Sequence, residues 1–239
     1  MPSGTVTFLF TDIEGSTQLA QQHPEAMPAL LARHHEILHE SIQRHHGYIF
    51  EVIGDSFAAA FHSAVDALNA ARTAQQSLHA QAWTPAPIKV RMGIHTGTAH
   101  LNDKSAPTVY SGYATLALTQ RIMSAGHGGQ ILLSGGTREL VRETLAEDTE
   151  LVDLGERRLK DLMHPEHLYQ LNASGLPTDF PPLKTLDSFR NNLPVQLTTF
   201  IGRRKEIVEI QHELKKHRLV TLIGPGGIGK TRLSFETAH

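Results

Sequence analysis

Residues 6–17 read VTFLFTDIEGST, a stretch that joins an apolar run to a pair of acids. The β-branched and aromatic residues at 6–10 predict a buried strand. Asp12 stands at the carboxyl end of that strand, and the Gly-Ser-Thr that follows can open a helix. Asp12 is therefore open to two interpretations: a cap for free backbone N–H groups at a helix start, or a metal ligand at a strand tip.

A second aspartate occupies a similar place in GYIFEVIGDSFAAAF, residues 47–61. Two short apolar runs around Gly54 and Asp55 predict a β-hairpin with Asp55 in its turn. At the end of a sheet, Asp12 and Asp55 could hold a hard cation together with phosphate oxygens, the ligand set that Mg²⁺ prefers. Two such ions can activate a hydroxyl nucleophile and neutralise a leaving pyrophosphate. Spacing alone leaves caps and turns as the alternative.

The rest of the first 172 residues alternates between helical and strand periodicity. The expected helices cover 25–46, 63–82, 114–125 and 136–146, and the expected strands cover 88–94, 130–134, 150–154 and 166–171. This order predicts an α/β (α+β) sandwich of ferredoxin-like type, with helices packed on one sheet.

The composition narrows the class of protein. Of 239 residues, 40% are hydrophobic and 19% charged, the net charge is −2, and there is no cysteine. These values fit a globular protein, and they exclude disulfides and thiolate chemistry. They give no electrostatic reason to expect nucleic acid or a membrane surface as a partner. With no signal peptide and no apolar run of about 18 residues, we expect a soluble, cytoplasmic protein.

Five ordered motifs over residues 3–172 resemble the catalytic domain of class III adenylate and guanylate cyclases. They are FTDIEGST, GYIFEVIGDSFAAAF, VRMGIHTG, QRIMSAGHGGQILLS and LGERRLKDLMHPEHLYQL. The resemblance implies a ferredoxin-like nucleotidyl cyclase sandwich in which Asp12, Asp55 and the backbone carbonyl of Ile13 hold two Mg²⁺ or Mn²⁺ ions. It also implies attack of a ribose 3′-hydroxyl on the α-phosphate of a nucleoside triphosphate. The products are a 3′,5′-cyclic nucleotide and pyrophosphate, and a head-to-tail homodimer shares its active sites.

Three further roles follow from the resemblance. Arg121 stands at the position of the family's transition-state arginine, and Lys160 at that of a phosphate-contacting lysine. Glu51, four residues before Asp55, stands at a position that reads the base in the family. This position is Lys in adenylate cyclases and Glu in guanylate cyclases. The resemblance therefore slightly favours GTP over ATP as the substrate.

Two positions depart from the family pattern. The asparagine expected four residues before Arg121 is Ala117, and Thr108, Val109 and Tyr110 occupy the region of a second base-reading aspartate. The chain is therefore expected to be a nucleotidyl cyclase, with one alternative from another class. That alternative is a weak or inactive cyclase-like module that dimerises, binds nucleotide and regulates an attached signalling ATPase.

The last part of the chain carries a second motif. A Pro-rich linker is expected at 173–200, a charged helix at 203–218 and a strand at 219–223. The stretch that follows, GPGGIGKT at 224–231, fits the pattern of a phosphate loop. Its glycines, Gly224, Gly226, Gly227 and Gly229, would let the backbone approach the phosphates. Lys230 would reach the β/γ oxygens, and Thr231 would ligate Mg²⁺. Residues 201–239 resemble the start of the signal-transduction ATPases with numerous domains. As no second acidic Mg²⁺ ligand follows, we expect a fragment that does not hydrolyse ATP.

One other pattern has a structural explanation. Residues 35–39, HEILH, match the zinc-binding H-E-x-x-H pattern on a helix. The glycine that would let a third histidine turn back is replaced by Ile42, so we interpret these histidines as part of a solvated helix face.

Overall fold

The computed structural model describes residues 1–103, 109–186 and 202–238, and it divides into two compact units, Met1–Phe189 and Arg190–His239. Thr108 and the second half of the expected linker lie outside the described residues. The first unit contains, in chain order, β1 (Gly4–Ile13), α1 (Ser16–Gln22), α2 (Met27–Arg44), β2 (Tyr48–Ile53), β3 (Ser56–Phe61), α3 (Ala64–Ala80), β4 (Val90–Leu101), β5 (Tyr110–Ser111), α4 (Tyr113–Ala125), β6 (Ile131–Ser134), α5 (Gly135–Val141), β7 (Thr149–Arg157) and β8 (Glu166–Ala173).

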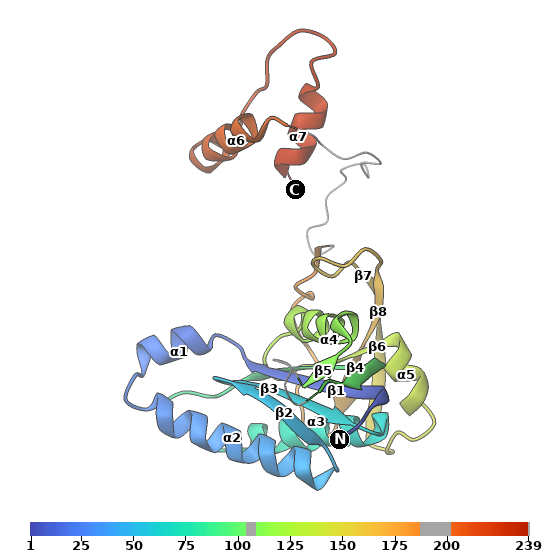
Figure 1. Ribbon diagram of the computed structural model, residues 1–239. Helices are drawn as coiled ribbons and strands as arrows, with labels where there is room; N and C mark the ends of the chain where they lie inside the picture. Colours follow the sequence, from blue (N-terminus) through green and yellow to red (C-terminus); the bar gives the residue numbers. More distant parts are fainter. Residues whose placement is uncertain (104–108, 187–201, 239) are drawn as a thin grey trace. The chain divides into compact units, whose positions relative to one another are not determined.

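One mixed sheet organises this unit, with the strand order β2-β3-β1-β4-β6-β8-β7 and the short β5 paired to β4 (Figure 1). β1 lies between β3 and β4 and is antiparallel to both. β4 and β6 are parallel, so the chain must cross over between them, and α4 provides that crossover. The sheet and its helices confirm the predicted α/β (α+β) class and the cyclase-type sandwich.

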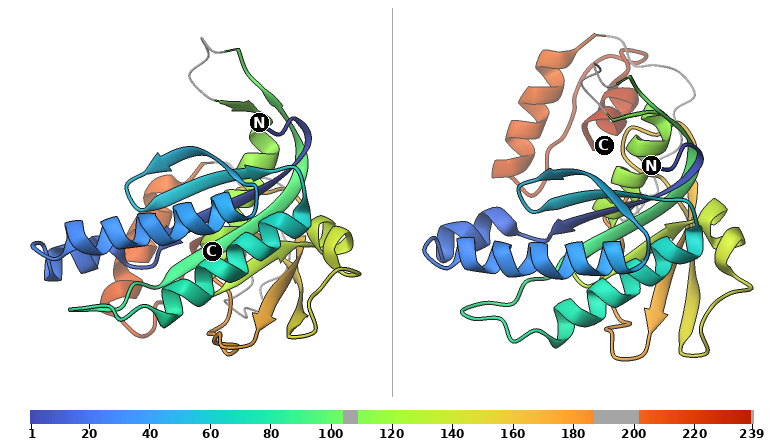
Figure 2. Two further views of the ribbon diagram at one scale, coloured as in Figure 1. Left: turned by 90° about the horizontal axis from the view of Figure 1, so that it is seen from below. Right: turned by 60° about the horizontal axis from the view of Figure 1, so that its bottom comes forward.

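One face of the sheet is covered by α2, α3 and α5 (Figures 1 and 2). The apolar stripe of α2 buries Leu30, Ile37, Leu38 and Ile42 at helical spacing. α3 instead presents buried alanines, which let it approach the strands closely. Its first turn is capped by Ser63, whose hydroxyl accepts a hydrogen bond from the backbone N–H of Asp66. This face therefore carries the main core of the unit.

The opposite face carries α4 (Figure 1). This helix approaches β4 so closely that a Cβ on Gly93 would lie 2.5 Å from the backbone nitrogen of Met123. Only glycine permits that approach, which fixes the height of α4 above the sheet. Beside α4, Phe8, Phe50 and Tyr110 make edge-to-face ring contacts with centroids 5.0–5.8 Å apart. Aromatic packing thus covers the part of this face that α4 leaves open.

Residues 174–186, which we call the C-terminal strap, run across the first unit without regular secondary structure apart from turns and bends. The backbone N–H of Lys184 donates to the carbonyl of Ala125 at 2.9 Å, and that of Leu186 donates to the carbonyl of Arg158 at 3.0 Å. Leu183 is buried in the cluster under α4. The first compact unit runs to Phe189, so it includes this strap.

The second unit contains two described helices, α6 (Arg204–Lys216) and α7 (Lys230–Ala238), which contact each other. The charged helix expected at 203–218 is confirmed as α6. The strand expected at 219–223 is wrong, because these residues have no regular secondary structure. A strand needs a hydrogen-bonded neighbour, and the described residues supply none for this segment. Within the described ranges, no helix is both long and apolar enough to span a lipid bilayer.

A histidine is buried beside the main core. The side chain of His34 on α2 is fully buried, and neither of its ring nitrogens has a hydrogen-bond partner among the described residues. Burial is the main cause that lowers the pKa of His34 to about 4, with a smaller contribution from His35. His34 is therefore neutral in the folded protein at neutral pH.

We expect acid to destabilise the fold through His34. An unfolded histidine takes up its proton near pH 6.5, whereas folded His34 does so only near 4, so the free energy of unfolding should fall as the pH drops between these values. The expected loss is about 1–3 kcal/mol. Urea unfolding of His34→Phe should show a flatter pH profile than the wild type. Burial also lowers the pKa of His95 to about 4, so some dependence remains. The exposed His62→Ala is the control, and equal slopes for all three proteins would refute the assignment.

Candidate active site

The structure brings the two predicted metal ligands together. Asp12 is the penultimate residue of β1, and Asp55 lies in the two-residue turn between β2 and β3. Because β1 and β3 are antiparallel, the end of one strand lies beside the start of the other. The backbone N–H of Ile13 donates to Oδ2 of Asp55 at 3.0 Å, and the Ser56 hydroxyl donates to Oδ1 of Asp12 at 2.8 Å. The carboxylates therefore belong to one polar site.

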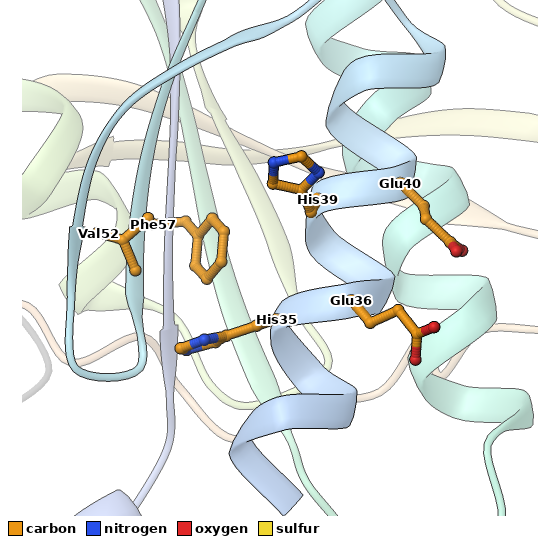
Figure 3. A pocket seen from close by; sticks show the side chains of 6 residues that line it. All are labelled: His35, Glu36, His39, Glu40, Val52 and Phe57. Carbon is orange, nitrogen blue, oxygen red and sulfur yellow. The ribbon is translucent and has the colours of Figure 1, made fainter.

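The turn that carries Asp55 has a second support. Gly54 adopts a positive φ of 60°, as tight hairpin turns require. On the α2 side, Nε2 of His35 lies 2.9 Å from the Gly54 carbonyl and donates to it. Figure 3 shows His35 and His39 directed towards Phe57 and Val52 of the hairpin, across a cavity of about 490 Å³, whereas the two glutamates of α2 point away. His35 of α2 thus stabilises the turn that carries Asp55 through this hydrogen bond.

Arg91 is a member of this site that the sequence analysis did not identify. It is the register partner of Asp12 on β4, and its Nε donates to Oδ2 of Asp12 at 3.0 Å. Both side chains are largely buried, with 23% and 17% exposed. The guanidinium therefore neutralises Asp12 from within the sheet. The alternating strand at 88–94 indicated which face Arg91 occupies, but only the β1–β4 register identifies its partner.

The donor set fits a divalent cation that is also held by substrate. Two carboxylates and the Ile13 carbonyl lie at this sheet end, and Mg²⁺ commonly takes one or two carboxylates with phosphates and waters. In the part of the chain that the structure describes, no group of three or more His, Cys, Asp or Glu side chains could hold a metal ion by itself. The HEILH histidines accordingly have no third zinc ligand there.

Arg121 and Lys160 lie in a different part of the unit. Arg121 projects from α4, and its Nη2 donates to Oδ2 of Asp161 at 2.7 Å. Lys160, the neighbour of Asp161, is exposed in the β7–β8 connection. Among the described residues, no hydrogen bond or ion pair joins Arg121 to Asp12 or Asp55. One chain thus presents two separate groups of predicted site residues.

The remaining predicted positions are on the surface of the same unit. Glu51 is exposed on β2, where a register shift between Ile49 and Glu51 marks an irregularity in the pairing with β3. Ala117 lies one helical turn before Arg121 on α4. No hydrogen bond of the Glu51 side chain to another described residue fixes its direction.

The chain is related to known cyclases over most of the first unit. The sequence model of the adenylate and guanylate cyclase catalytic domain matches residues 1–173. The chain belongs to this family. An uncharacterised protein of Mycobacterium tuberculosis is 41% identical over 211 residues, covering 86% of this chain and 70% of that protein. A receptor-type adenylate cyclase of Trypanosoma equiperdum is 30% identical over 206 residues, covering 70% of this chain and 44% of that protein.

The solved structures agree with this membership. An adenylate cyclase structure from Trypanosoma brucei, determined in the monomeric state, superposes with a TM-score of 0.66 at 26% identity. The match covers 77% of this chain and 94% of that one. Catalytic domains of the cyclase family bind nucleoside triphosphates, use divalent metal ions and typically work as dimers.

The phosphate-loop motif adopts a glycine-rich turn in the second unit. Gly227 and Gly229 have φ values of 76° and 85°, and α7 begins at Lys230. Nζ of Lys230 donates to the carbonyls of Gly224 and Pro225 at 2.7 and 2.8 Å, so the lysine folds back over its own loop. The roles expected for this loop remain predictions.

We expect Asp12→Asn or Asp55→Asn to weaken Mn²⁺ binding by more than about tenfold, because each removes one of two anionic ligands. Electron paramagnetic resonance of free Mn²⁺ during titration measures this directly, with circular dichroism to confirm folding. Asp153→Asn removes an exposed carboxylate that pairs with His167 elsewhere and is the control. Unchanged affinity in both site variants would exclude these aspartates as ligands.

Proposed function

We propose that the first unit is a nucleotidyl cyclase that converts a purine nucleoside triphosphate into its 3′,5′-cyclic nucleotide and pyrophosphate for intracellular signalling. The observation that carries this proposal is the meeting of Asp12 and Asp55 at one sheet end, in a chain of the cyclase family. An inactive module would have little need to keep both carboxylates there. GTP and ATP are both candidate substrates, with a slight lean to GTP from Glu51.

In the proposed reaction, the 3′-oxygen forms a bond to the α-phosphorus, the bond from that phosphorus to the pyrophosphate oxygen breaks, and the hydroxyl proton is released. Asp12, Asp55 and the Ile13 carbonyl would hold two Mg²⁺ or Mn²⁺ ions. Such ions, when bound, activate the hydroxyl and neutralise the leaving pyrophosphate. To free Asp12 for this role, the Arg91 guanidinium must give up part of its contact with that carboxylate.

The second group of residues would act on the nucleotide. Arg121 would stabilise the charge that develops on the α-phosphate, and Lys160 would contact the terminal phosphates. The ion pair between Arg121 and Asp161 has to open first. The side chains of Arg121 and Asp161 are 35% and 59% exposed, so solvent screens this ion pair and opening it costs little.

We infer a head-to-tail homodimer with shared active sites. Among the described residues of one chain, no hydrogen bond or ion pair joins the two groups of site residues, which supports a site completed by a second copy. A two-fold dimer would supply the metal-binding group from one protomer and Arg121 from its partner.

The alternative function is that of a dimeric module that binds nucleotide but has weak or no cyclase activity. Ala117 favours it, because an alanine cannot supply the amide that orients the ribose in the family. In this alternative, the first unit binds nucleotide and regulates the second unit. There, the glycine turn and the position of Lys230 at the start of α7 support a phosphate-binding loop of a signalling ATPase.

The decisive assay mixes purified protein with Mn²⁺ and each of the four nucleoside triphosphates, and then quantifies cyclic product. We expect cyclic GMP or cyclic AMP. Asp55→Ala and Arg121→Ala should each be inactive, and mixing the two after co-refolding should restore up to roughly a quarter of the wild-type sites.

The control for this complementation is a mixture of Asp12→Ala with Asp55→Ala. Both changes lie in the same half-site, so no hybrid dimer has an intact site, and activity should stay absent. Recovery in the control mixture, or none in the test mixture, would contradict the shared-site dimer. Wild-type protein that binds nucleotide without forming cyclic product would favour the alternative.

Base selectivity gives a separate prediction for Glu51. A carboxylate can accept from the N1–H and the amine of guanine, whereas a lysine suits the N1 acceptor of adenine. Glu51→Lys should shift the GTP/ATP ratio of kcat/KM towards ATP by roughly tenfold, in line with about 1–3 kcal/mol for a mismatched polar contact. The exposed Glu150→Lys controls for the added positive charge. A ratio that stays constant in Glu51→Lys would show that this residue does not read the base.

A further inference from the structure

Glu14, the residue after Ile13, is held by groups from distant parts of the first unit. Its Oε2 accepts a hydrogen bond from the backbone N–H of Gly128 at 3.0 Å, and its Oε1 pairs with the ammonium of Lys184. Nδ1 of His127 lies 3.7 Å from Oε1. Glu14 is therefore bound both by the C-terminal strap and by the loop after α4.

Lys184 is itself held in place by its backbone. Its N–H donates to the Ala125 carbonyl at the end of α4, and the preceding Leu183 is buried against that helix. The backbone fixes where the side chain starts, and the ammonium then reaches Glu14. One residue of the C-terminal strap thus links the end of α4, which carries Arg121, to the turn after β1, which carries Asp12.

The strap is held at points rather than along its whole length. Cavities of about 440 and 410 Å³ are both lined by Asp179, Phe180 and Pro181, so they flank this stretch of the strap. Dense packing would fix the strap without specific contacts. With open space beside it, specific contacts hold the strap: the Thr178 carbonyl accepts from Gln170 at 2.8 Å, the Pro182 carbonyl accepts from Nε2 of His127 at 3.1 Å, and Lys184 pairs with Glu14.

The turn after β1 is attached to its surroundings at several points. The Ile13 N–H donates to Asp55, the Glu14 N–H donates to the Lys89 carbonyl at 2.9 Å, and the Glu14 carboxylate binds Lys184 and Gly128. The first two hold the backbone from the sheet side. The carboxylate holds it from the strap and from the loop after α4.

We propose that Glu14 and Lys184 are positioning residues of the metal site: their ion pair fixes the turn after β1, so that Asp12 and the Ile13 carbonyl are set for metal binding. This inference rests on the proposed function of Asp12 and Asp55.

The sign of one measurement separates positioning from simple electrostatics. Lys184→Met removes a positive charge near the site, which on charge alone would strengthen binding of a divalent cation. Positioning predicts the opposite: Mn²⁺ affinity of the full chain, measured by paramagnetic resonance without nucleotide, should fall by about tenfold. Lys184→Arg keeps the charge and the reach, and should retain most of the affinity. Lys89→Met removes a different lysine, one that lines the 440 Å³ cavity together with Glu14, and is the matched control.

Glu14→Gln gives the second half of the test, because its amide oxygen can still accept from Gly128 while the ion pair is lost. The double variant with Lys184→Met should bind Mn²⁺ no more weakly than the weaker single variant. If Lys184→Met does not fold, the Lys184→Arg and Glu14→Gln comparison remains: affinity retained in the former and lost in the latter supports the proposal, and equal affinities overturn it.

The outcomes separate the two claims. Wild-type Mn²⁺ binding with unchanged or tighter binding in Lys184→Met overturns the positioning role and leaves the proposed metal site standing. Absence of Mn²⁺ binding in the wild type overturns both.

Discussion

The antiparallel pairing of β1 with β3 is the constraint on which the candidate site depends. Asp12 and Asp55 are far apart in the sequence. The pairing of β1 with β3 brings the end of β1 beside the β2–β3 turn. The bond from the Ile13 N–H to Asp55 closes the arrangement at 3.0 Å. A slip of one residue between these strands would turn Asp12 to the opposite face, where the buried core lies.

The charges around this pairing explain why the site suits a cation. Arg91 neutralises Asp12 from the neighbouring strand, whereas Asp55 receives only neutral donors: the backbone N–H of Ile13 is its one described hydrogen-bond partner. A divalent ion bound here would compensate Asp55 and compete with Arg91 for Asp12. The site is thus folded and partly neutralised before any metal arrives, and a bound ion would have to displace part of the Arg91 contact with Asp12.

The sequence predicted those features that depend on residues close together in the chain. The β2–β3 hairpin, the helices on both faces and the position of Asp12 at a strand tip follow from periodicity and turn residues, and the structure agrees with them. The role of Arg91 beside Asp12 could be identified only from the β1–β4 register. The Glu14–Lys184 ion pair joins residues whose sequence context gives no periodic signal. The strand expected at 219–223 failed for a related reason, since an apolar run becomes a strand only beside a pairing neighbour. The roles of Glu51, Lys160 and the phosphate loop come from family resemblance and stay predictions.

The central claim is that the Asp12–Asp55 site holds a divalent cation against the phosphates of a nucleotide. Electron–nuclear double resonance at ³¹P tests it most directly, with Mn²⁺ and a non-reactive α,β-methylene analogue of GTP or ATP bound to the protein. The account predicts ³¹P hyperfine couplings to Mn²⁺ in the wild type and their loss in Asp55→Ala. Mn²⁺ and nucleotide that both bind to the wild type without any ³¹P coupling would contradict it.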